Sequence, residues 1–289
     1  MAENEKNQCE SASSCDRESC EGCPSRGAEM ADFRVDQNIY SDIGHVIGIV
    51  SGKGGVGKSL VTASLANLLA KEGYRVGILD ADITGPSIPK MYGLTGPASA
   101  IDEGILPVLT KNDIKVMSLN LLLPDPGQAV VWRGPVIAGV VKQFWTDVVW
   151  GELDYLLVDM PPGTGDVPLT VFQSLPVDGI MIVTSPQELV EMIVRKAYNM
   201  AGLMNIPVLG VIENYSYLIC PDCGKKIPLF GESRIEKTAK ELEIPLAGQI
   251  PLKASLAAAA DAGSFADVSE EELSGAVTIL RSLPEKEES

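Results

Sequence analysis

The stretch Gly52-Lys53-Gly54-Gly55-Val56-Gly57-Lys58-Ser59 decides the fold of this chain. It matches G-x-x-x-x-G-K-[ST], the pattern of a phosphate-binding loop, whose glycines let consecutive backbone N–H groups face a polyphosphate. The apolar run at 46–50 before it predicts a buried strand, and residues 59–70 after it predict a helix. This strand–loop–helix context is the one in which the loop binds phosphate at a helix N-terminus. The sequence therefore predicts a nucleotide-binding α/β fold.

The side chains of the loop are expected to have different roles. Lys58 is expected to reach the β- and γ-phosphates, and the Ser59 hydroxyl to join the Mg²⁺ shell. Lys53 is an additional cation that closing the loop does not need, which points to a second contact with nucleotide, here or in a partner subunit. The nucleotide-binding residues expected from this segment are Gly52, Lys53, Gly54, Gly55, Val56, Gly57, Lys58, Ser59 and Leu60.

Composition excludes several other classes of function. The chain has 289 residues and a net charge of −16, which argues against sequence-independent nucleic-acid binding because that needs a basic surface. The N-terminus lacks the basic and apolar regions of a signal peptide, and no uninterrupted apolar stretch has membrane-spanning length. The acidic C-terminus would be repelled by anionic lipid. A cytoplasmic protein without nucleic-acid or membrane partners is expected.

Three regions are predicted along the chain. Residues 1–42 are polar and cysteine-containing and predict a flexible extension, residues 43–283 an ATPase domain, and residues 284–289 an acidic tail. Within the domain, alternating strands and helices predict a doubly wound, mostly parallel sheet flanked by helices, with ligands at the carboxyl ends of its strands. The expected strands are 46–50, 76–79, 114–118, 155–159, 179–184, 208–212 and 244–250. The expected helices are 59–72, 135–149, 186–204, 232–243 and 270–280.

Carboxylates follow two of these strands. Asp80 and Asp82 can hold a magnesium-bound water or orient the attacking water, and Asp159 closes an apolar run as a magnesium-contacting aspartate does. Asp166 ends a Pro/Gly loop that is suited to hinge when a γ-phosphate arrives or leaves. Asp80 or Asp166 alone would equally fit a turn or cap residue. Their ordered spacing behind the phosphate loop favours the nucleotide site, whereas His45, the only histidine, is expected to be structural or exposed.

The six cysteines form two groups. In a reducing cytosol, clustered thiols are more often metal or cluster ligands than disulfides. Cys220-Pro221-Asp222-Cys223-Gly224 is a tight turn with two thiols, whereas Zn²⁺ and [4Fe–4S] sites commonly take four. The missing pair comes either from a second copy across a two-fold axis or from Cys20-Glu21-Gly22-Cys23, as in a zinc ribbon. The N-terminal group is Cys9, Cys15, Cys20 and Cys23.

Further motifs place the chain beside a known family. They are Lys53 with Lys58, Asp80-Ala81-Asp82 with Gly85-Pro86-Ser87-Ile88-Pro89, Asp159 to Asp166, Trp132-Arg133-Gly134-Pro135, Leu153-Asp154-Tyr155, Ser185-Pro186-Gln187-Glu188, Glu213-Asn214-Tyr215-Ser216, the Cys220–Cys223 turn and Ile250-Pro251-Leu252. Together they resemble the deviant-Walker ATPases with a SIMIBI/MinD-like P-loop fold. Within these, the chain is similar to the Mrp/ApbC family of iron–sulfur cluster carriers over about residues 45–263.

The resemblance implies roles for particular residues of the nucleotide site. Lys53 would reach across a dimer to the partner's nucleotide, and Asp82 would activate the attacking water. Asp80 and Asp159 would lie near the metal. Asn214 would recognise the adenine base through its side-chain amide, although Asn214 would also fit as an ordinary turn residue. The expected catalytic residues are Lys53, Lys58 and Asp82.

The resemblance also implies a cargo. A homodimer would share one [4Fe–4S] cluster between Cys220 and Cys223 of both subunits, and would work with cluster assembly factors and apo iron–sulfur proteins. Cys20-Glu21-Gly22-Cys23-Pro24 resembles the N-terminal cluster motif of the longer, cytosolic scaffold members, which implies a second cluster. The spacing departs from that motif, since no cysteine closely follows Cys23 and Cys15 is additional, so spare thiols are the alternative.

Two other functions share the loop. A MinD/ParA-like spatial-organising switch with a structural zinc at the CxxC is the main alternative, but the chain is acidic and lacks a basic amphipathic C-terminal helix. An electron-donating ATPase resembling the nitrogenase iron protein would share a cluster through two widely separated single cysteines. The tight CxxC argues against it.

Overall fold

The computed structural model describes residues 35–82, 85, 87–123, 134–163, 165–186 and 190–284. The predictions for Cys9, Cys15, Cys20 and Cys23 and for the tail beyond residue 284 lie outside these residues. The domain limits at 43 and 283 stay predictions.

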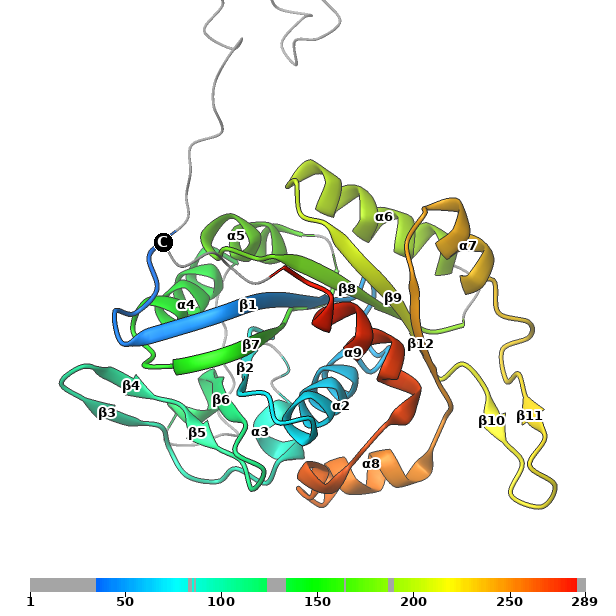
Figure 1. Cartoon of the computed structure of the whole chain (residues 1–289), viewed down its shortest axis with the longest axis horizontal. Helices are drawn as coiled ribbons and strands as arrows, with labels where there is room; N and C mark the ends of the chain where they lie inside the picture. Colours follow the sequence, from blue (N-terminus) through cyan, green and yellow to red (C-terminus); the bar gives the residue numbers. More distant parts are fainter. Residues whose placement is uncertain are drawn as a thin grey trace, which may run out of the picture. The chain divides into compact units, whose positions relative to one another are not determined.

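One sheet organises the described residues, and eight of their strands belong to it (Figure 1). The strand order is β12-β9-β8-β1-β7-β2-β6-β5, in which β5 is antiparallel to β6 and all other neighbours are parallel. The predicted mostly parallel α/β fold is therefore confirmed. The strands are β1 (Ser41–Val50), β2 (Val76–Asp80), β5 (Val108–Leu109), β6 (Lys115–Ser118), β7 (Gly151–Asp159), β8 (Gly179–Thr184), β9 (Val208–Asn214) and β12 (Leu246–Ile250).

Helices cover both faces of this sheet, as parallel strands require (Figure 1). On one face lie α4 (Gly134–Thr146), α5 (Asp166–Ser174), α6 (Val190–Leu203) and α7 (Ile235–Glu241). On the other lie α2 (Lys58–Lys71), α3 (Ile88–Met91), α8 (Ala254–Asp261) and α9 (Ser274–Arg281).

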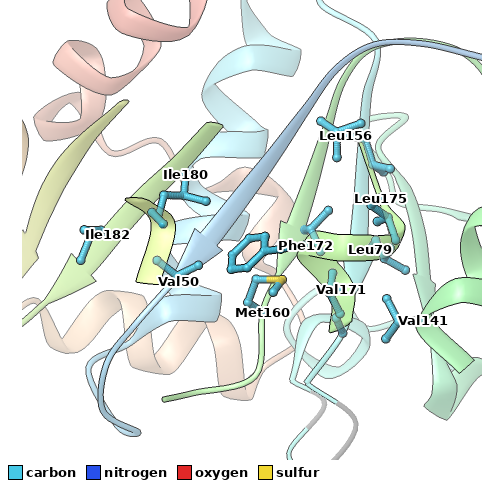
Figure 2. Close-up of a cluster of buried hydrophobic side chains, with 14 of the residues drawn as sticks. Val50, Leu79, Val141, Leu156, Met160, Val171, Phe172, Leu175, Ile180 and Ile182 are labelled. Atoms are coloured by element: carbon cyan, nitrogen blue, oxygen red, sulfur yellow. The ribbon is translucent and has the colours of Figure 1, made fainter. Parts of the chain in front are cut away.

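Successive strand residues supply two separate cores, one for each face. Val46 and Val50 of β1 pack in the core under α4 and α5, whereas Ile47 and Ile49 pack in the core under α2 and α9. Figure 2 shows the first of these cores, where Phe172 of α5 lies beside Val50. Because both faces of the central strands are buried, polar side chains are concentrated at the strand ends.

The strand ends place the polar residues together. β2, β7 and β9 are apolar through most of their length and finish on Asp80, Asp159 and Asn214, each of which is buried. The register sets Asp80 opposite Asp159 on one neighbour and opposite Ser118 on the other. In a parallel sheet these carboxyl ends share one edge, where ligands bind.

Several elements differ from the sequence-based expectations. β1 and β7 start at Ser41 and Gly151, ahead of the predicted 46 and 155, because the two strands pair from their first residues although these are partly polar. Helices α5 and α8 and the hairpin of β3 (Ser99–Ile101) with β4 (Gly104–Leu106) had no prediction. None of the helices in the described part of the chain is long and apolar enough to cross a bilayer.

Candidate functional site

The phosphate loop joins β1 to α2, and its path depends on glycine at two positions. Gly57 has a φ of +78°, and a Cβ there would lie 2.2 Å from Asn214 Nδ2 and 2.9 Å from the Tyr215 hydroxyl. A Cβ on Gly52 would lie 2.4 Å from Ile193 Cγ2. Real Cβ contacts do not come this close, so a side chain at either position would force its neighbours to shift. The predicted loop geometry is therefore built into the surrounding packing.

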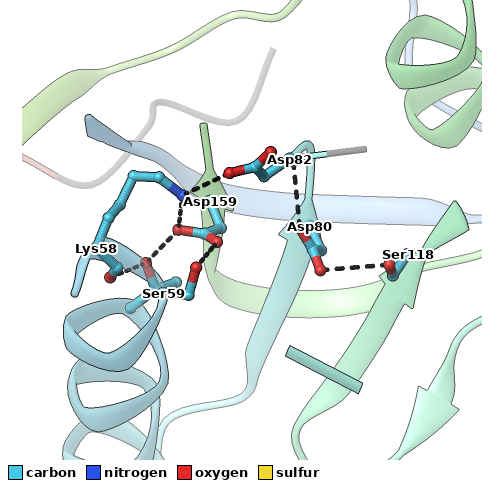
Figure 3. A network of polar contacts seen from close by, with 7 residues as sticks. Lys58, Ser59, Asp80, Asp82, Ser118 and Asp159 are labelled. Carbon is cyan, nitrogen blue, oxygen red and sulfur yellow. Dashed lines mark hydrogen bonds and ion pairs between the residues drawn. The ribbon is translucent and has the colours of Figure 1, made fainter. Parts of the chain in front are cut away.

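Asp159 gathers the polar side chains of the first turn of α2 (Figure 3). Lys58 Nζ lies 2.6 Å from Asp159 Oδ1, and the Ser59 hydroxyl donates to Oδ2 at 2.6 Å. Thr62 also donates to Oδ1, at 2.9 Å, and the carboxylate is fully buried. The lysine expected to bind phosphate and the serine expected to bind Mg²⁺ are therefore both held by the aspartate that closes β7.

Thr62 is a residue that the sequence reasoning missed. Its signal was available, because a polar side chain at i+4 from Lys58 lies on the same helix face and meets the same carboxylate.

Asp80 lies beside this network and is also buried. It is 1% exposed, accepts the Ser118 hydroxyl at 3.3 Å and accepts the Asp82 N–H at 3.2 Å. Burial, reinforced by the charge of neighbouring Asp159, holds the pKa of Asp80 well above its usual range, against the opposing effect of Lys58. Asp82 is more open and lies 4.0 Å from Lys58 Nζ. The structure thus brings the three predicted aspartates together around one lysine.

This burial predicts a stabilising substitution. In the unfolded chain an aspartate loses its proton near pH 4, whereas folded Asp80 keeps its proton to higher pH, so the native state binds more protons between the two values. The free energy of unfolding therefore falls as pH rises through that window. Without nucleotide and with EDTA, Asp80→Asn should raise it at pH 7–8 by on the order of 1 kcal/mol or more, with the gain shrinking towards pH 4. Urea titrations at several pH values measure this difference, and a gain that is the same at every pH would contradict the assigned cause.

A cleft of about 350 Å³ opens in front of the loop. Its volume falls within the usual range for small-molecule sites. Its walls are formed by the loop itself, by Asp82 and Pro162, and by Lys90 and Asp261 from α3 and α8. Lys53 of the loop is exposed. The cleft therefore lies against the expected phosphate-binding groups.

The oxygen atoms around the cleft suit Mg²⁺ that arrives with nucleotide. The Ser51 hydroxyl, which lines the cleft, is buried and has no hydrogen-bond partner within the described residues. The same residues contain no cluster of three or more histidine, cysteine or acidic side chains able to hold a metal ion. Because Mg²⁺ is usually bound by one or two protein oxygens together with phosphates and water, Ser59 and Asp159 are the residues that would hold it.

Asn214, at the end of β9, also contacts the phosphate loop. Its side chain is fully buried, donates from Nδ2 to the Val56 carbonyl at 2.9 Å, and accepts the Tyr215 N–H at 2.9 Å. The residue predicted to read adenine is thus bonded in this structure to the phosphate loop itself. Its contact with the base stays a prediction.

The second cysteine pair lies on a small hairpin outside the main sheet. The strands β10 (Leu218–Ile219) and β11 (Lys226–Ile227) pair antiparallel, and Gly224, with a φ of +72°, donates to the Cys220 carbonyl at 2.9 Å. Backbone N–H groups, first of Cys223 and then of Asp222, point at the Cys220 sulfur and lower the pKa of its thiol. The thiolate, which a lowered pKa favours, is the form of cysteine that binds metal.

The hairpin brings two thiols together at the surface. Cys223 is exposed and Cys220 is partly exposed, and no third ligand joins them from the described ranges. Four large apolar side chains on or beside the hairpin are 38–53% exposed. They are Ile219, Ile227, Leu229 and Phe230. Thiols and apolar surface are therefore presented outward together.

The phosphate loop after the first strand, the buried aspartate at the end of β7 and the mostly parallel sheet define a P-loop NTPase. A family model described as NUBPL iron-transfer P-loop NTPase matches residues 42–285, and the chain belongs to this family. The family resemblance seen in the sequence is confirmed.

Relatives of the chain agree with this assignment. It is 48% identical over 259 residues to the iron-sulfur cluster carrier protein of Methanocaldococcus jannaschii, covering 84% of this chain and 87% of the relative. A solved nucleotide-binding protein of Archaeoglobus fulgidus, in complex with ADP and with cobalt found in it, is 47% identical, with a TM-score of 0.71 over 78% of this chain and 88% of that one. The cell division ATPase MinD of Pyrococcus furiosus is 22% identical, with a TM-score of 0.56 over 82% and 96%, and shows the shared fold alone.

Proposed function

We propose that this chain is an ATP-hydrolysing iron–sulfur cluster carrier or scaffold that works as a homodimer. One [4Fe–4S] cluster is held between Cys220 and Cys223 of two subunits and is passed to apo iron–sulfur proteins. The observation that carries this proposal is the outward-facing hairpin with two thiols and no further ligand among the described residues. The relative from Methanocaldococcus jannaschii is an iron-sulfur cluster carrier protein, which supports the same cargo.

ATP is the proposed nucleotide, and the residues around the cleft divide the work. Lys58, now paired with Asp159, would bind the β- and γ-phosphates, and Asp159 and Ser59 would hold Mg²⁺. Bound Mg²⁺ supplies charge neutralisation for the transferred phosphoryl group. Asp82, near Lys58 but more open than Asp80, orients the attacking water.

The number of thiols on the hairpin supports a dimer. Two thiols in each subunit make four when two copies face each other across a two-fold axis, and the apolar side chains around the hairpin then bury against their copies. Lys53 is proposed to enter the partner's nucleotide site, so that nucleotide controls the alignment of the two thiol pairs. Cluster assembly factors are the proposed donors, and Cys9, Cys15, Cys20 and Cys23 are proposed to hold a second cluster.

Metal and sulfide analysis of anaerobically isolated protein tests this function. We expect iron and acid-labile sulfide in equal amounts, with broad absorption near about 400 nm from thiolate-bound cluster. Zinc without sulfide would support the structural zinc site instead. Protein without metal, even after reconstitution with iron and sulfide, would contradict a carrier.

Replacing Lys53 with alanine should separate nucleotide binding from ATP hydrolysis and cluster release. Because Lys53 is exposed and is not needed to close the loop, ATP affinity should change little, whereas hydrolysis and cluster release should fall by on the order of tenfold or more. ATP titration, phosphate release and transfer to an apoprotein measure the three steps. Lys111→Ala, at another exposed lysine, is the matched control. Normal cluster transfer by Lys53→Ala would show that Lys53 does not couple nucleotide to cargo.

A further inference from the structure

The last two residues of β9 point to opposite faces of the sheet. Along this strand Val211 packs in the core beside α6 and α7, and Ile212 packs in the core beside α2 and α9. By the same alternation, Glu213 faces the side of α7 and Asn214 faces the side of α2. Each side chain is fully buried, and each bonds to a different functional part of the chain.

Asn214 holds the phosphate loop. Its amide bonds to the Val56 carbonyl at 2.9 Å and lies so close to Gly57 that a Cβ there would come within 2.2 Å. The next residue, Tyr215, has a φ of +59° and brings its hydroxyl close to Gly57 as well. A movement of the loop backbone around bound phosphate therefore meets the end of β9 directly.

Glu213 contacts both ends of the segment that carries the cysteine hairpin. Its carboxylate accepts the Ser216 hydroxyl at 2.5 Å and the Ser233 hydroxyl at 2.6 Å. These serines stand immediately before and after the segment 217–232, which carries the two cysteines. Gln249 of β12 completes the group by donating to Glu213 at 3.2 Å. Because the hairpin strands are outside the main sheet, their direction is set by contacts at the ends of the segment. These are the Glu213 clamp and the backbone hydrogen bonds that join Ser216 and Tyr217 to Ile250 and Leu252.

We propose that Glu213 and Asn214 are positioning residues that couple the nucleotide loop to the cysteine hairpin within one subunit. Asn214 follows the loop, and the adjoining Glu213 transmits the change to Ser216 and Ser233, which sets the direction of Cys220 and Cys223. This inference rests on the proposed function for its purpose, since the link would time cluster release. It differs from the dimer route through Lys53 because it operates inside each subunit.

Site-resolved alkylation of the thiols tests the link without any cluster. Full-length, metal-free protein is pulsed with iodoacetamide, with and without ATP and Mg²⁺, and the rates at Cys220 and Cys223 are read by mass spectrometry. In the unmodified chain we expect nucleotide to change these rates by about fivefold, in the range of ordinary allosteric coupling. Glu213→Gln keeps the shape of the side chain but replaces one of the two accepting oxygens with an amide NH2 group. It should abolish most of the change while leaving ATP affinity within about twofold.

Two further variants keep the result interpretable. Glu232→Gln makes the same chemical change at an exposed neighbour of Ser233 and should retain the full nucleotide response. Ser233→Ala removes one of the contacts of Glu213, at a residue that is partly exposed. It should weaken the nucleotide response, and it provides a test even if Glu213→Gln does not fold. A nucleotide response that survives in both Glu213→Gln and Ser233→Ala, or that is absent from the unmodified chain, would overturn the proposal. Iron and sulfide analysis is independent of the alkylation rates. The proposed carrier function and the proposed coupling through Glu213 and Asn214 can therefore fail separately.

Discussion

Gly57→Ala should lose nucleotide binding, with the affinity for ADP weakened by at least about 100-fold, or 2.7 kcal/mol. The added methyl group has no room, because the Asn214 amide and the Tyr215 hydroxyl already occupy the space that it needs. The loop would have to move away from β9 and lose the bond from Asn214 to Val56. Its φ of +78° adds strain for any residue other than glycine. Titration calorimetry with ADP and Mg²⁺ measures the loss.

Gly73→Ala is the control that separates strain from steric conflict. Gly73 follows α2 with a φ of +94°, but nothing lies within 4 Å of a Cβ built there. This variant should cost about 1 kcal/mol of unfolding free energy, from the strain of a Cβ at positive φ, and leave ADP affinity unchanged. If Gly57→Ala binds ADP as the unmodified chain does, the packing between the loop and β9 does not constrain the site.

The core of the fold was predictable because local signals agreed with the global arrangement. Apolar runs such as 155–159 are buried on both faces, so they are continuous instead of alternating, and the aspartates that end them mark the ligand edge. For this reason Lys58, Asp80, Asp82 and Asp159 were found together from sequence, and the structure brings them together.

Other features depend on partners far away in the chain, which one sequence does not reveal. Asn214 bonds to Val56, 158 residues earlier, and Glu213 bonds to Ser233 and Gln249. No local pattern distinguishes these contacts from an ordinary strand end. The β10–β11 hairpin was likewise missed as structure, because strands of two residues are shorter than any periodic signal.

The largest effect on cargo is expected from the cysteine hairpin. In a chain whose Cys9, Cys15, Cys20 and Cys23 are replaced by serine, reconstitution should give about two irons per chain, or one [4Fe–4S] cluster per dimer. The double variant Cys220→Ala/Cys223→Ala in the same background should lose all iron, all sulfide and the absorption near about 400 nm. The loss is complete because no other ligand cluster exists in the described part of the chain to take over.

The control for this pair is Asp222→Asn, which changes the turn between the cysteines but keeps both thiols and the backbone N–H groups that face Cys220. It should retain the cluster, because those N–H groups, rather than a side-chain charge, lower the pKa of Cys220 and favour the thiolate that binds iron. Iron and sulfide that persist in the double alanine variant would place the ligands elsewhere. Loss in Asp222→Asn as well would show that cluster binding depends on the carboxylate beside the thiols, so that the loss in the double alanine variant would no longer identify the cysteines as the four shared ligands.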